Sequence, residues 1–268
     1  TCFEGPEEEL RRTEIQQPAI LTTSIAILRA LGEVTALSPV YLAGHSLGEY
    51  TALVAAGSLD FETAVALVHA RGRFMQEAVP DGRGAMAAIL GCGSEEVLEA
   101  CRAAERESGG VGAPANVNAP QQIVISGDAA AVELAGAEAR KRGAARAMRL
   151  AVSAPFHSSL MEPAAEKLAA ELGRVHFADP RVPVVTNVEA RPNSDGARVP
   201  ELLRRQVTAP VRFTESVQCL AGLGVRRLLE VGPGRVLSAL VARIDRSLER
   251  LGVSTMADVT DVAAALKD

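Results

Sequence analysis

Hydrophobic and polar residues follow each other in blocks that predict alternating helices and strands. Between residues 17 and 32 the apolar positions have helical spacing, with Pro18 in the expected first turn: Ile20, Leu21, Ile25, Leu28 and Leu31. Residues 40–43 form a short apolar run of the strand type, which leads directly into Gly44. Helices are then expected over 47–56 and, with Asp60 as the N-cap, over about 60–79.

The pattern changes after residue 84, where short strands alternate with amphipathic helices. Strands are expected at 85–90, 111–118, 122–126 and 145–150, and helices at 94–105 and 130–142. The order β-α-β-β-α-β is typical of a ferredoxin-like unit. We therefore expect a ferredoxin-like small domain at 84–152, inserted into a large domain formed by 1–83 plus 153–268.

The rest of the chain again alternates helices with strongly apolar strands. Helices are expected at 161–172, 200–207, 213–223 and 236–247, and strands at 182–186 and 225–230. Apolar strands alternating with helices favour a parallel sheet that is covered on both faces. The sequence thus predicts an α/β fold, a large α/β-hydrolase-like parallel-sheet domain with an inserted ferredoxin-like small domain.

The composition excludes several classes of function. The 268 residues include 48% hydrophobic and 23% charged residues, and the net charge is −5. With only 3% aromatic residues and no Trp, the chain lacks the signature of a nucleic-acid binder. No apolar run reaches the length of about 20 residues that a membrane span needs. The four cysteines have no metal-binding spacing, so we expect no metal and a cytoplasmic protein with reduced thiols.

One motif carries candidate chemistry, the segment Gly44-His45-Ser46-Leu47-Gly48 between an expected strand and an expected helix. In this context a G-x-S-x-G segment indicates a nucleophile elbow, which exposes the serine oxygen on a sharp turn. The amide of Leu47, at the start of the following helix, is then placed to stabilise an oxyanion. The alternative is a glycine-rich turn without catalytic use.

A serine nucleophile needs a base, and the chain offers four histidines: His45, His69, His157 and His176. We favour His157, because it lies in the loop-like segment SAPFHSSLM, and functional groups concentrate in loops. His45 is expected to pack under the elbow, His69 to lie on a helix face and His176 at a strand edge. Asp179 and Asp195 follow His157, which is the wrong order for an α/β-hydrolase triad.

Arg71 lies on a predicted helix whose apolar side includes Phe74 and Met75. A guanidinium near that side needs an acidic partner, and a substrate carboxylate can supply one in a bidentate pair. The alternative is a surface arginine whose stem covers apolar neighbours.

Six segments in this order resemble the malonyl-CoA:acyl-carrier-protein transacylases of bacterial fatty-acid synthesis: GHSLGEYTAL, RGRFMQEAVPDGRGAM, NVNAPQQIVISG, SAPFHSSLM, RRQVTAPVRF and EVGPGRVL. The resemblance runs from about Phe3 to the C-terminal end. It implies a ping-pong transfer in which Ser46 accepts malonyl from malonyl-CoA and passes it to the phosphopantetheine thiol of acyl carrier protein. Coenzyme A is then a carried substrate, and no cofactor is expected.

The resemblance also implies roles for individual residues. His157 is the general base, held by the backbone carbonyl of Gln206 rather than by an acid, and Arg71 pairs with the malonyl carboxylate. A bulky residue at Phe156 is associated with selection of malonyl over methylmalonyl. The residues expected around the substrate are therefore Arg71, Gln17, Phe156, Met75 and His45.

The chain departs from the family at its start. The family begins with a strand and a Gly-Gln-Gly loop that supplies a second oxyanion donor, and this sequence shows neither. Since one such donor accounts for a factor of about 10²–10³ in rate, we expect the natural protein to be longer and this chain to be weakly active or inactive.

Other functions stay open from the sequence: a polyketide-synthase-type acyltransferase domain, a serine esterase or thioesterase, and a non-catalytic docking module. Three basic pairs are candidates for docking an acidic carrier protein: Lys141-Arg142, Arg204-Arg205 and Arg226-Arg227. We expect a monomer that binds neither nucleic acid nor membrane.

Overall fold

The computed structural model describes residues 2, 4–80, 82–152 and 154–266 and has a mixed α/β fold. The helices are α1 (Glu7–Leu10), α2 (Thr13–Val34), α3 (Leu47–Ala55), α4 (Phe61–Glu77), α5 (Ser94–Ser108), α6 (Ala129–Lys141), α7 (Glu162–Leu172), α8 (Val199–Thr208), α9 (Phe213–Gly222), α10 (Val236–Ile244) and α11 (Met256–Ala265). The strands are β1 (Leu42–Ala43), β2 (Gly84–Leu90), β3 (Gly112–Ala119), β4 (Gln122–Asp128), β5 (Arg146–Arg149), β6 (Val184–Val185), β7 (Pro192–Asn193), β8 (Arg227–Val231) and β9 (Glu249–Val253). Short 3₁₀ turns precede α7 and α8 at Ser159–Met161 and Gly196–Arg198.

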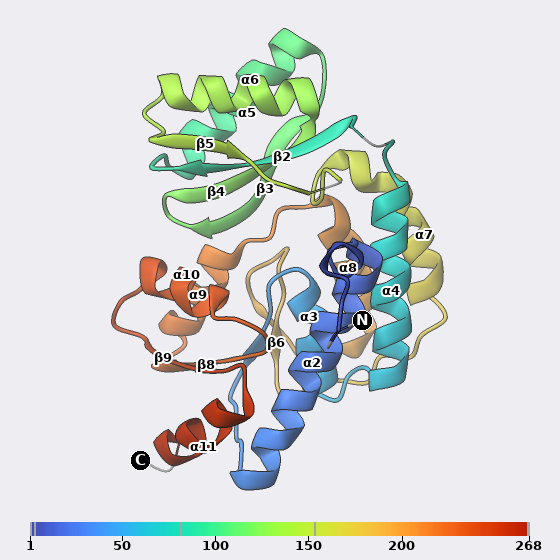
Figure 1. The fold of residues 1–268 in the computed structure, drawn as a ribbon, viewed down its shortest axis with the longest axis vertical. Coiled ribbons are helices and arrows are strands. Elements are labelled where there is room, and N and C mark those ends of the chain that lie inside the picture. The colour runs from blue at the N-terminus through green and yellow to red at the C-terminus, as the bar shows by residue number, and fades with distance from the viewer. Residues whose placement is uncertain (1, 3, 81, 153, 267–268) are drawn as a thin grey trace.

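A four-stranded antiparallel sheet forms the upper part of the molecule in Figure 1, with α5 and α6 on its outer face. Its strand order is β3-β4-β2-β5, and the register places Ile89 of β2 opposite Ile123 of β4. Both isoleucines are fully buried against the small side chains of α5 and α6, such as Ala100 and Ala135. The order β-α-β-β-α-β expected for 84–152 is the order observed.

The lower part contains two smaller sheets between helices. Strand β1 pairs in parallel with β6, which pairs antiparallel with β7, while β8 and β9 form a separate parallel pair. Among the described residues the expected parallel sheet is present only as these two short parallel pairs, which belong to separate sheets. The strand expected at 40–43 shrinks to Leu42–Ala43, because Val40 is 68% exposed and has no neighbouring strand to cover it.

Other sequence expectations also need correction. Helix α2 begins at Thr13, so Pro18 lies inside the helix rather than in its first turn. Strands β7 and β9 and helix α11 were not expected; β9 mixes Glu249 and Arg250 with apolar residues and so lacks a clear strand pattern. The expected domain boundary at Ser153, and the start of the resemblance at Phe3, lie outside the described residues.

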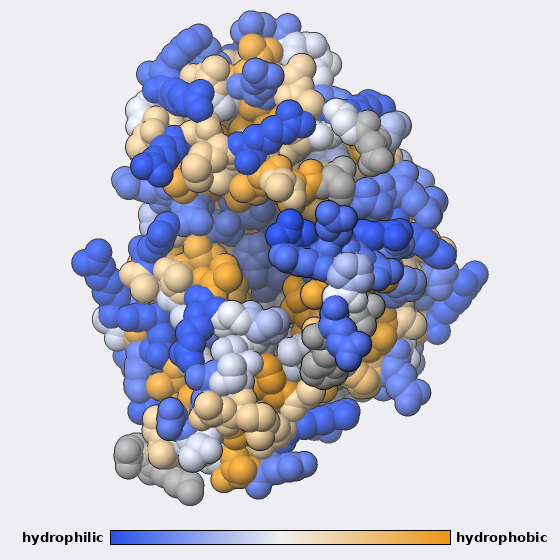
Figure 2. Space-filling model, in the orientation of Figure 1, coloured by the Kyte–Doolittle hydropathy of each residue, from blue (hydrophilic) through white to orange (hydrophobic). Residues whose placement is uncertain are grey.

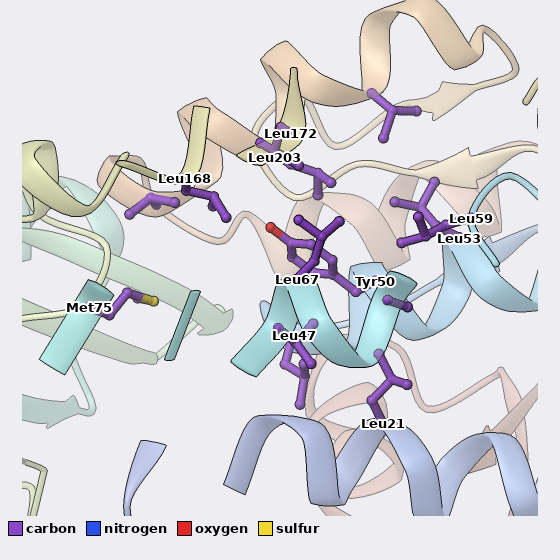
Figure 3. Close-up of a cluster of buried hydrophobic side chains, with 14 of the residues drawn as sticks. Leu21, Leu47, Tyr50, Leu53, Leu59, Leu67, Met75, Leu168, Leu172 and Leu203 are labelled. Carbon is purple, nitrogen blue, oxygen red and sulfur yellow. The ribbon is translucent and has the colours of Figure 1, made fainter. Parts of the chain in front are cut away.

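The largest hydrophobic cluster joins α2, α3, α4, α7 and α8 beneath the four-stranded sheet (Figure 3). Leu21, Leu67 and Leu203 come from three different helices and surround Tyr50 of α3. Burying leucines of this kind contributes about 1.5–3 kcal/mol each, so the cluster holds α3 and α4 rigidly. Within the described part of the chain, no helix is both long and apolar enough to cross a membrane.

Candidate active site

Ser46 stands at the junction of β1 and α3 in a strained backbone conformation, with φ 52° and ψ −104°. Gly44 permits this turn, since a Cβ atom there would lie 2.0 Å from the backbone carbonyl carbon and oxygen of Gly48. Asn187, in the loop after β6, holds the elbow from the side. Its Oδ1 accepts a hydrogen bond from the Ser46 amide at 2.6 Å, and its Nδ2 donates to the Gly44 carbonyl at 2.7 Å.

His157 reaches Ser46 from the loop before α7. The Ser46 Oγ to His157 Nε2 distance is 2.8 Å, and His157 Nδ1 lies 2.7 Å from the backbone oxygen of Gln206. A carbonyl oxygen can only accept, so Nδ1 carries the proton and a neutral His157 presents Nε2 as an acceptor. Burial, and then the nearby Arg71 guanidinium, lower the pKa of His157 to about 3, which keeps the ring neutral.

Arg71 projects from α4 into the same place and is only 2% exposed. Its Nη1 donates to Gln17 Oε1 at 2.6 Å, and its Nη2 donates to Ser46 Oγ at 3.0 Å and to Gln206 Oε1 at 2.9 Å. The ring of Tyr50 lies 5.5 Å from the guanidinium carbon. Burial lowers the pKa of Arg71.

No carboxylate forms an ion pair with Arg71 among the described residues, and its Nε has no hydrogen-bond partner there. The Glu49 carboxylate acts on Arg71 only through space and through the Gln206 amide, so the buried cation still favours an approaching anion. The arrangement is therefore suited to a substrate whose negative charge lies close to the Ser46 hydroxyl.

Two residues of this network were not singled out from the sequence, Glu49 and Asn187. The carboxylate oxygen Oε2 of Glu49 accepts one hydrogen bond from Gln206 Nε2 at 2.7 Å and another from the backbone N–H of Asn187 at 3.0 Å. Burial raises the pKa of Glu49 to about 7, against the lowering effect of these hydrogen bonds and of Arg71. The available signal for Glu49 was an acidic residue in the Ala/Leu-rich segment that follows Ser46.

The remaining expected residues lie around this centre in different ways. Leu47 begins α3, and within the described chain its amide donates to no other group. Met75 Sδ is 4.0 Å from Gln17 Nε2. Phe156 is partly buried and packs between the large hydrophobic cluster and the inner face of the four-stranded sheet. His45 turns away from the Ser46 hydroxyl, with Nε2 2.8 Å from Asn118 Oδ1.

The other two histidines take no part in the site. His69 Nδ1 donates to the Glu14 carbonyl at 2.9 Å. His176 is exposed and lies outside any strand, so its expected place at a strand edge is wrong; the segment before β6 has no neighbouring strand to pair with. Asp179 and Asp195 accept hydrogen bonds from the amides of Gly196 and Ala197.

Figure 2 shows the surface hollowed below the four-stranded sheet, with hydrophilic residues on one rim and hydrophobic ones on the other. A separate cavity of about 390 Å³ lies elsewhere, lined by residues such as Asp60, Arg174 and His176. The described residues include no cluster of three or more His, Cys, Asp or Glu side chains that could hold a metal ion.

A serine on an elbow, with a histidine in hydrogen-bond contact, is the arrangement of enzymes that form acyl-serine intermediates. Comparison with known proteins agrees with this class. The model of the acyl transferase domain family matches residues 2–265. The chain therefore belongs to the acyl transferase domain family.

Two curated relatives have a more specific name than the family. The chain is 48% identical over 264 residues to a protein named malonyl CoA-acyl carrier protein transacylase from Escherichia coli K12, covering 98% of this chain and 84% of the relative. The Bacillus subtilis protein of the same name is 49% identical over 266 residues, covering 99% of this chain and 83% of the relative.

Two similar solved structures also have names of malonyl-transferring enzymes. An acyl carrier protein S-malonyltransferase from Vibrio cholerae superimposes with a TM-score of 0.94 at 45% identity, covering 97% of this chain and 84% of the other. A malonyl-transacylase in complex with a type II polyketide synthase acyl-carrier protein has a TM-score of 0.95 at 45% identity, covering 98% of this chain and 84% of the other.

Proposed function

We propose that this enzyme transfers a malonyl group from malonyl-CoA to the phosphopantetheine thiol of acyl carrier protein and so supplies extender units for fatty-acid synthesis. The observation that carries the proposal is the buried, unpaired guanidinium of Arg71, whose Nη2 lies 3.0 Å from Ser46 Oγ. The names of the relatives support both the donor and the acceptor.

The first half of the transfer acylates Ser46. The hydroxyl proton passes to His157 Nε2 while Oγ attacks the thioester carbonyl of malonyl-CoA. The Leu47 amide, at the N-terminus of α3, donates to the oxyanion that forms. When the C–S bond breaks, the proton on Nε2 moves to the sulfur, so that coenzyme A leaves as a thiol and malonyl-Ser46 stays as an ester.

The second half repeats these steps with a different thiol. His157 Nε2 takes the proton of the phosphopantetheine thiol, whose sulfur attacks the ester carbonyl. The C–O bond to Ser46 breaks, and the proton returns to Oγ. Gln206 holds the imidazole in the required tautomer through its backbone oxygen, which makes an acidic third residue unnecessary.

Arg71 gives the site its preference for a short acid. In a malonyl ester the free carboxylate is only two carbons from the ester carbonyl, so it has to lie next to Ser46, where Arg71 can hold it in a charge-assisted pair. That carboxylate also offsets the positive charge that lowers the pKa of His157, so a bound malonyl group makes His157 a better base. Gln17 holds Arg71 in place, and Met75, Phe156 and His45 complete the surroundings of the acyl group.

Other features of the proposal concern the whole chain. Residues 84–152 would form a ferredoxin-like small domain, and residues 1–83 plus 153–268 an α/β-hydrolase-like large domain. The enzyme would act as a cytoplasmic monomer without a bound cofactor. The bulk of Phe156 would disfavour an α-methyl group and hence methylmalonyl.

A second candidate differs only in the acceptor. One structural neighbour is a malonyl-transacylase solved with a type II polyketide synthase carrier protein. The same Ser46 chemistry could therefore load a polyketide carrier protein. Comparing the second half-reaction with carrier proteins of the two kinds separates these functions.

The test is intact-mass spectrometry after brief incubation with malonyl-CoA. We expect a slowly formed malonyl adduct on the wild-type chain, since its sequence shows only one oxyanion donor, no adduct on Ser46→Ala, and at least about tenfold less on Arg71→Ala, because the charge-assisted pair is lost. Acetyl-CoA is the matched donor without a carboxylate and should label far more slowly. Equal labelling by acetyl-CoA and malonyl-CoA would contradict the role of Arg71, and labelling of Ser46→Ala would exclude Ser46 as the nucleophile.

A further inference from the structure

Glu49 is a buried carboxyl group beside the Ser46–His157 pair that the transfer steps leave without a role. It lies on the first turn of α3 and is only 2% exposed. Carboxylates are rarely buried unless they are paired or hydrogen-bonded, because the desolvation of the charge is costly. The position of Glu49 therefore needs a reason.

The hydrogen bonds of Glu49 lead to both members of the pair. Its Oε2 accepts hydrogen bonds from Gln206 Nε2 at 2.7 Å and from the backbone N–H of Asn187 at 3.0 Å. Gln206 Nε2 also donates to the Ser46 carbonyl at 3.0 Å, and the backbone oxygen of Gln206 accepts from His157 at 2.7 Å. Asn187 Oδ1 accepts from the Ser46 amide at 2.6 Å.

One carboxylate oxygen is thus linked through two residues to the Ser46 peptide on both sides and to the acceptor that orients His157. We infer that Glu49 is a positioning residue of the acyl-transfer site: its carboxylate holds Gln206 and Asn187 so that Ser46 Oγ and His157 Nε2 stay within hydrogen-bond distance. The inference rests on the proposed roles of Ser46 and His157, but not on the identity of the acyl group.

The charge on Glu49 also reinforces the orientation of the Gln206 amide, which the Ser46 carbonyl and Arg71 favour as well. An acceptor at Oε2 requires Nε2 of Gln206 to face Glu49, which turns Oε1 toward Arg71 at 2.9 Å. A protonated Glu49 can donate instead, and the amide then keeps its orientation only through the Ser46 carbonyl and Arg71.

The surroundings of Glu49 make its charge sensitive to pH. The charged group that faces it is Arg71 of α4, and the adjacent Tyr50 on α3 is a further titratable group. From α8 and from the loop after β6 it meets the neutral Gln206 and Asn187. Its pKa of about 7 lies well above the value of about 3 for His157. Loss of Ser46 reactivity as the pH falls through 7 therefore reports on Glu49.

The test uses phenylmethanesulfonyl fluoride, which sulfonylates an activated serine without any carboxylate on the reagent. The rate of adduct formation is followed by intact mass from pH 5 to 9 in the wild type, Glu49→Gln and Glu49→Ala. Glu62→Gln is the matched control, because Glu62 is an exposed residue on α4. Thermal unfolding shows that each variant is folded.

We expect the wild-type rate to rise with a midpoint near pH 7. Glu49→Gln keeps one acceptor, so its rate should be about tenfold lower and independent of pH, while Glu49→Ala should lose about 10²-fold, as expected for a small misplacement of reacting groups. Glu62→Gln should behave as the wild type.

Wild-type labelling of folded Glu49→Ala, or an unchanged midpoint in Glu49→Gln, would overturn the inference. If the wild type is sulfonylated with this pH profile but is not acylated by malonyl-CoA, the malonyl assignment fails and the role of Glu49 stands. If the wild type is not sulfonylated, Ser46 is not an activated nucleophile, and both proposals fall.

Discussion

The four-stranded sheet with α5 and α6, and the helices around Ser46, bury very different side chains. The first region has a core of small apolar residues, and every positive φ among its described residues falls on a glycine, as at Gly91 and Gly143. The second buries Arg71 and Glu49 and takes positive φ at the non-glycine residues Ser46 and His157.

The difference shows that the energetically unfavourable features, buried charged side chains and positive φ at non-glycine residues, lie in the region around Ser46. Non-glycine residues in the left-handed region cost about 1–3 kcal/mol each and persist only where the surrounding structure holds them. The large cluster of leucines around Tyr50 supplies that support. We therefore expect substitutions near Ser46 to change activity more than stability, and substitutions in the sheet core to do the reverse.

The largest effect is expected from His157→Ala. It removes the proposed base, whose Nε2 contacts Ser46 Oγ, and the rate of acyl-enzyme formation should fall by about 10³–10⁴-fold. Rapid-quench measurement of the malonyl adduct checks this. The exposed His176→Ala is the control and should retain the full rate. A His157→Ala variant that is folded and fully active would contradict the expectation that substitutions near Ser46 mainly change activity.

The two glycines of the elbow should respond in opposite ways. A Cβ atom at Gly44 would lie 2.0 Å from the Gly48 backbone, whereas one at Gly48 meets nothing within 4 Å. Gly44→Ala should shift Ser46 and reduce acylation by about 10²-fold. Gly48→Ala should keep the activity and stabilise α3 by about 0.5 kcal/mol, since alanine is the better helix former. Acylation rates and urea unfolding of both variants test this; equal losses would contradict it.

Ile123→Ala addresses the other side of the comparison. Ile123 is fully buried in the sheet core, so the cavity should lower the free energy of unfolding by about 2–5 kcal/mol. The acylation rate per folded molecule should stay within about twofold of the wild type. Leu98→Ala, at a position 37% exposed on α5, is the control and should cost much less. Lost activity without lost stability would show that the sheet shapes the site directly.

The smallest effect concerns pH and stability. The pKa of His157 is about 3 in the folded protein, below its ordinary 6.5, so between these values the unfolded protein binds more protons. The histidine therefore destabilises the fold as the pH falls below 6.5, by about 1.4 kcal/mol between pH 7.5 and 5.5. The difference in unfolding free energy between the wild type and His157→Gln should change by this amount between the two pH values in urea unfolding, whereas the exposed His69→Gln should follow the wild type.

Periodicity predicted most helices well, because the apolar spacing of α4, α5 and α6 reflects burial of one face of each helix. The strands around the elbow were predicted less well. Strands β1 and β6 are only two residues long, and the length of a strand depends on the neighbours that pair with it.

The candidate site divides in the same way. Ser46 was singled out by its flanking glycines, and His157 by its loop. The contribution of Glu49 and Asn187 was not visible, since each acts through hydrogen bonds to segments far away in the sequence. No local pattern distinguishes Asn187 from an ordinary polar residue at the end of a strand, and the only local signal for Glu49 was its acidic side chain in the Ala/Leu-rich segment after Ser46.

By itself, the sequence determined the type and order of most elements and the presence of an elbow, because helical spacing and the steric freedom of glycine act within a few residues. Only the tertiary structure brought Ser46, His157 and Arg71 within hydrogen-bond distance and left Arg71 without a carboxylate partner among the described residues. The reason is physical: burial and charge interactions depend on every segment that surrounds a group, and those segments are adjacent only in the folded protein.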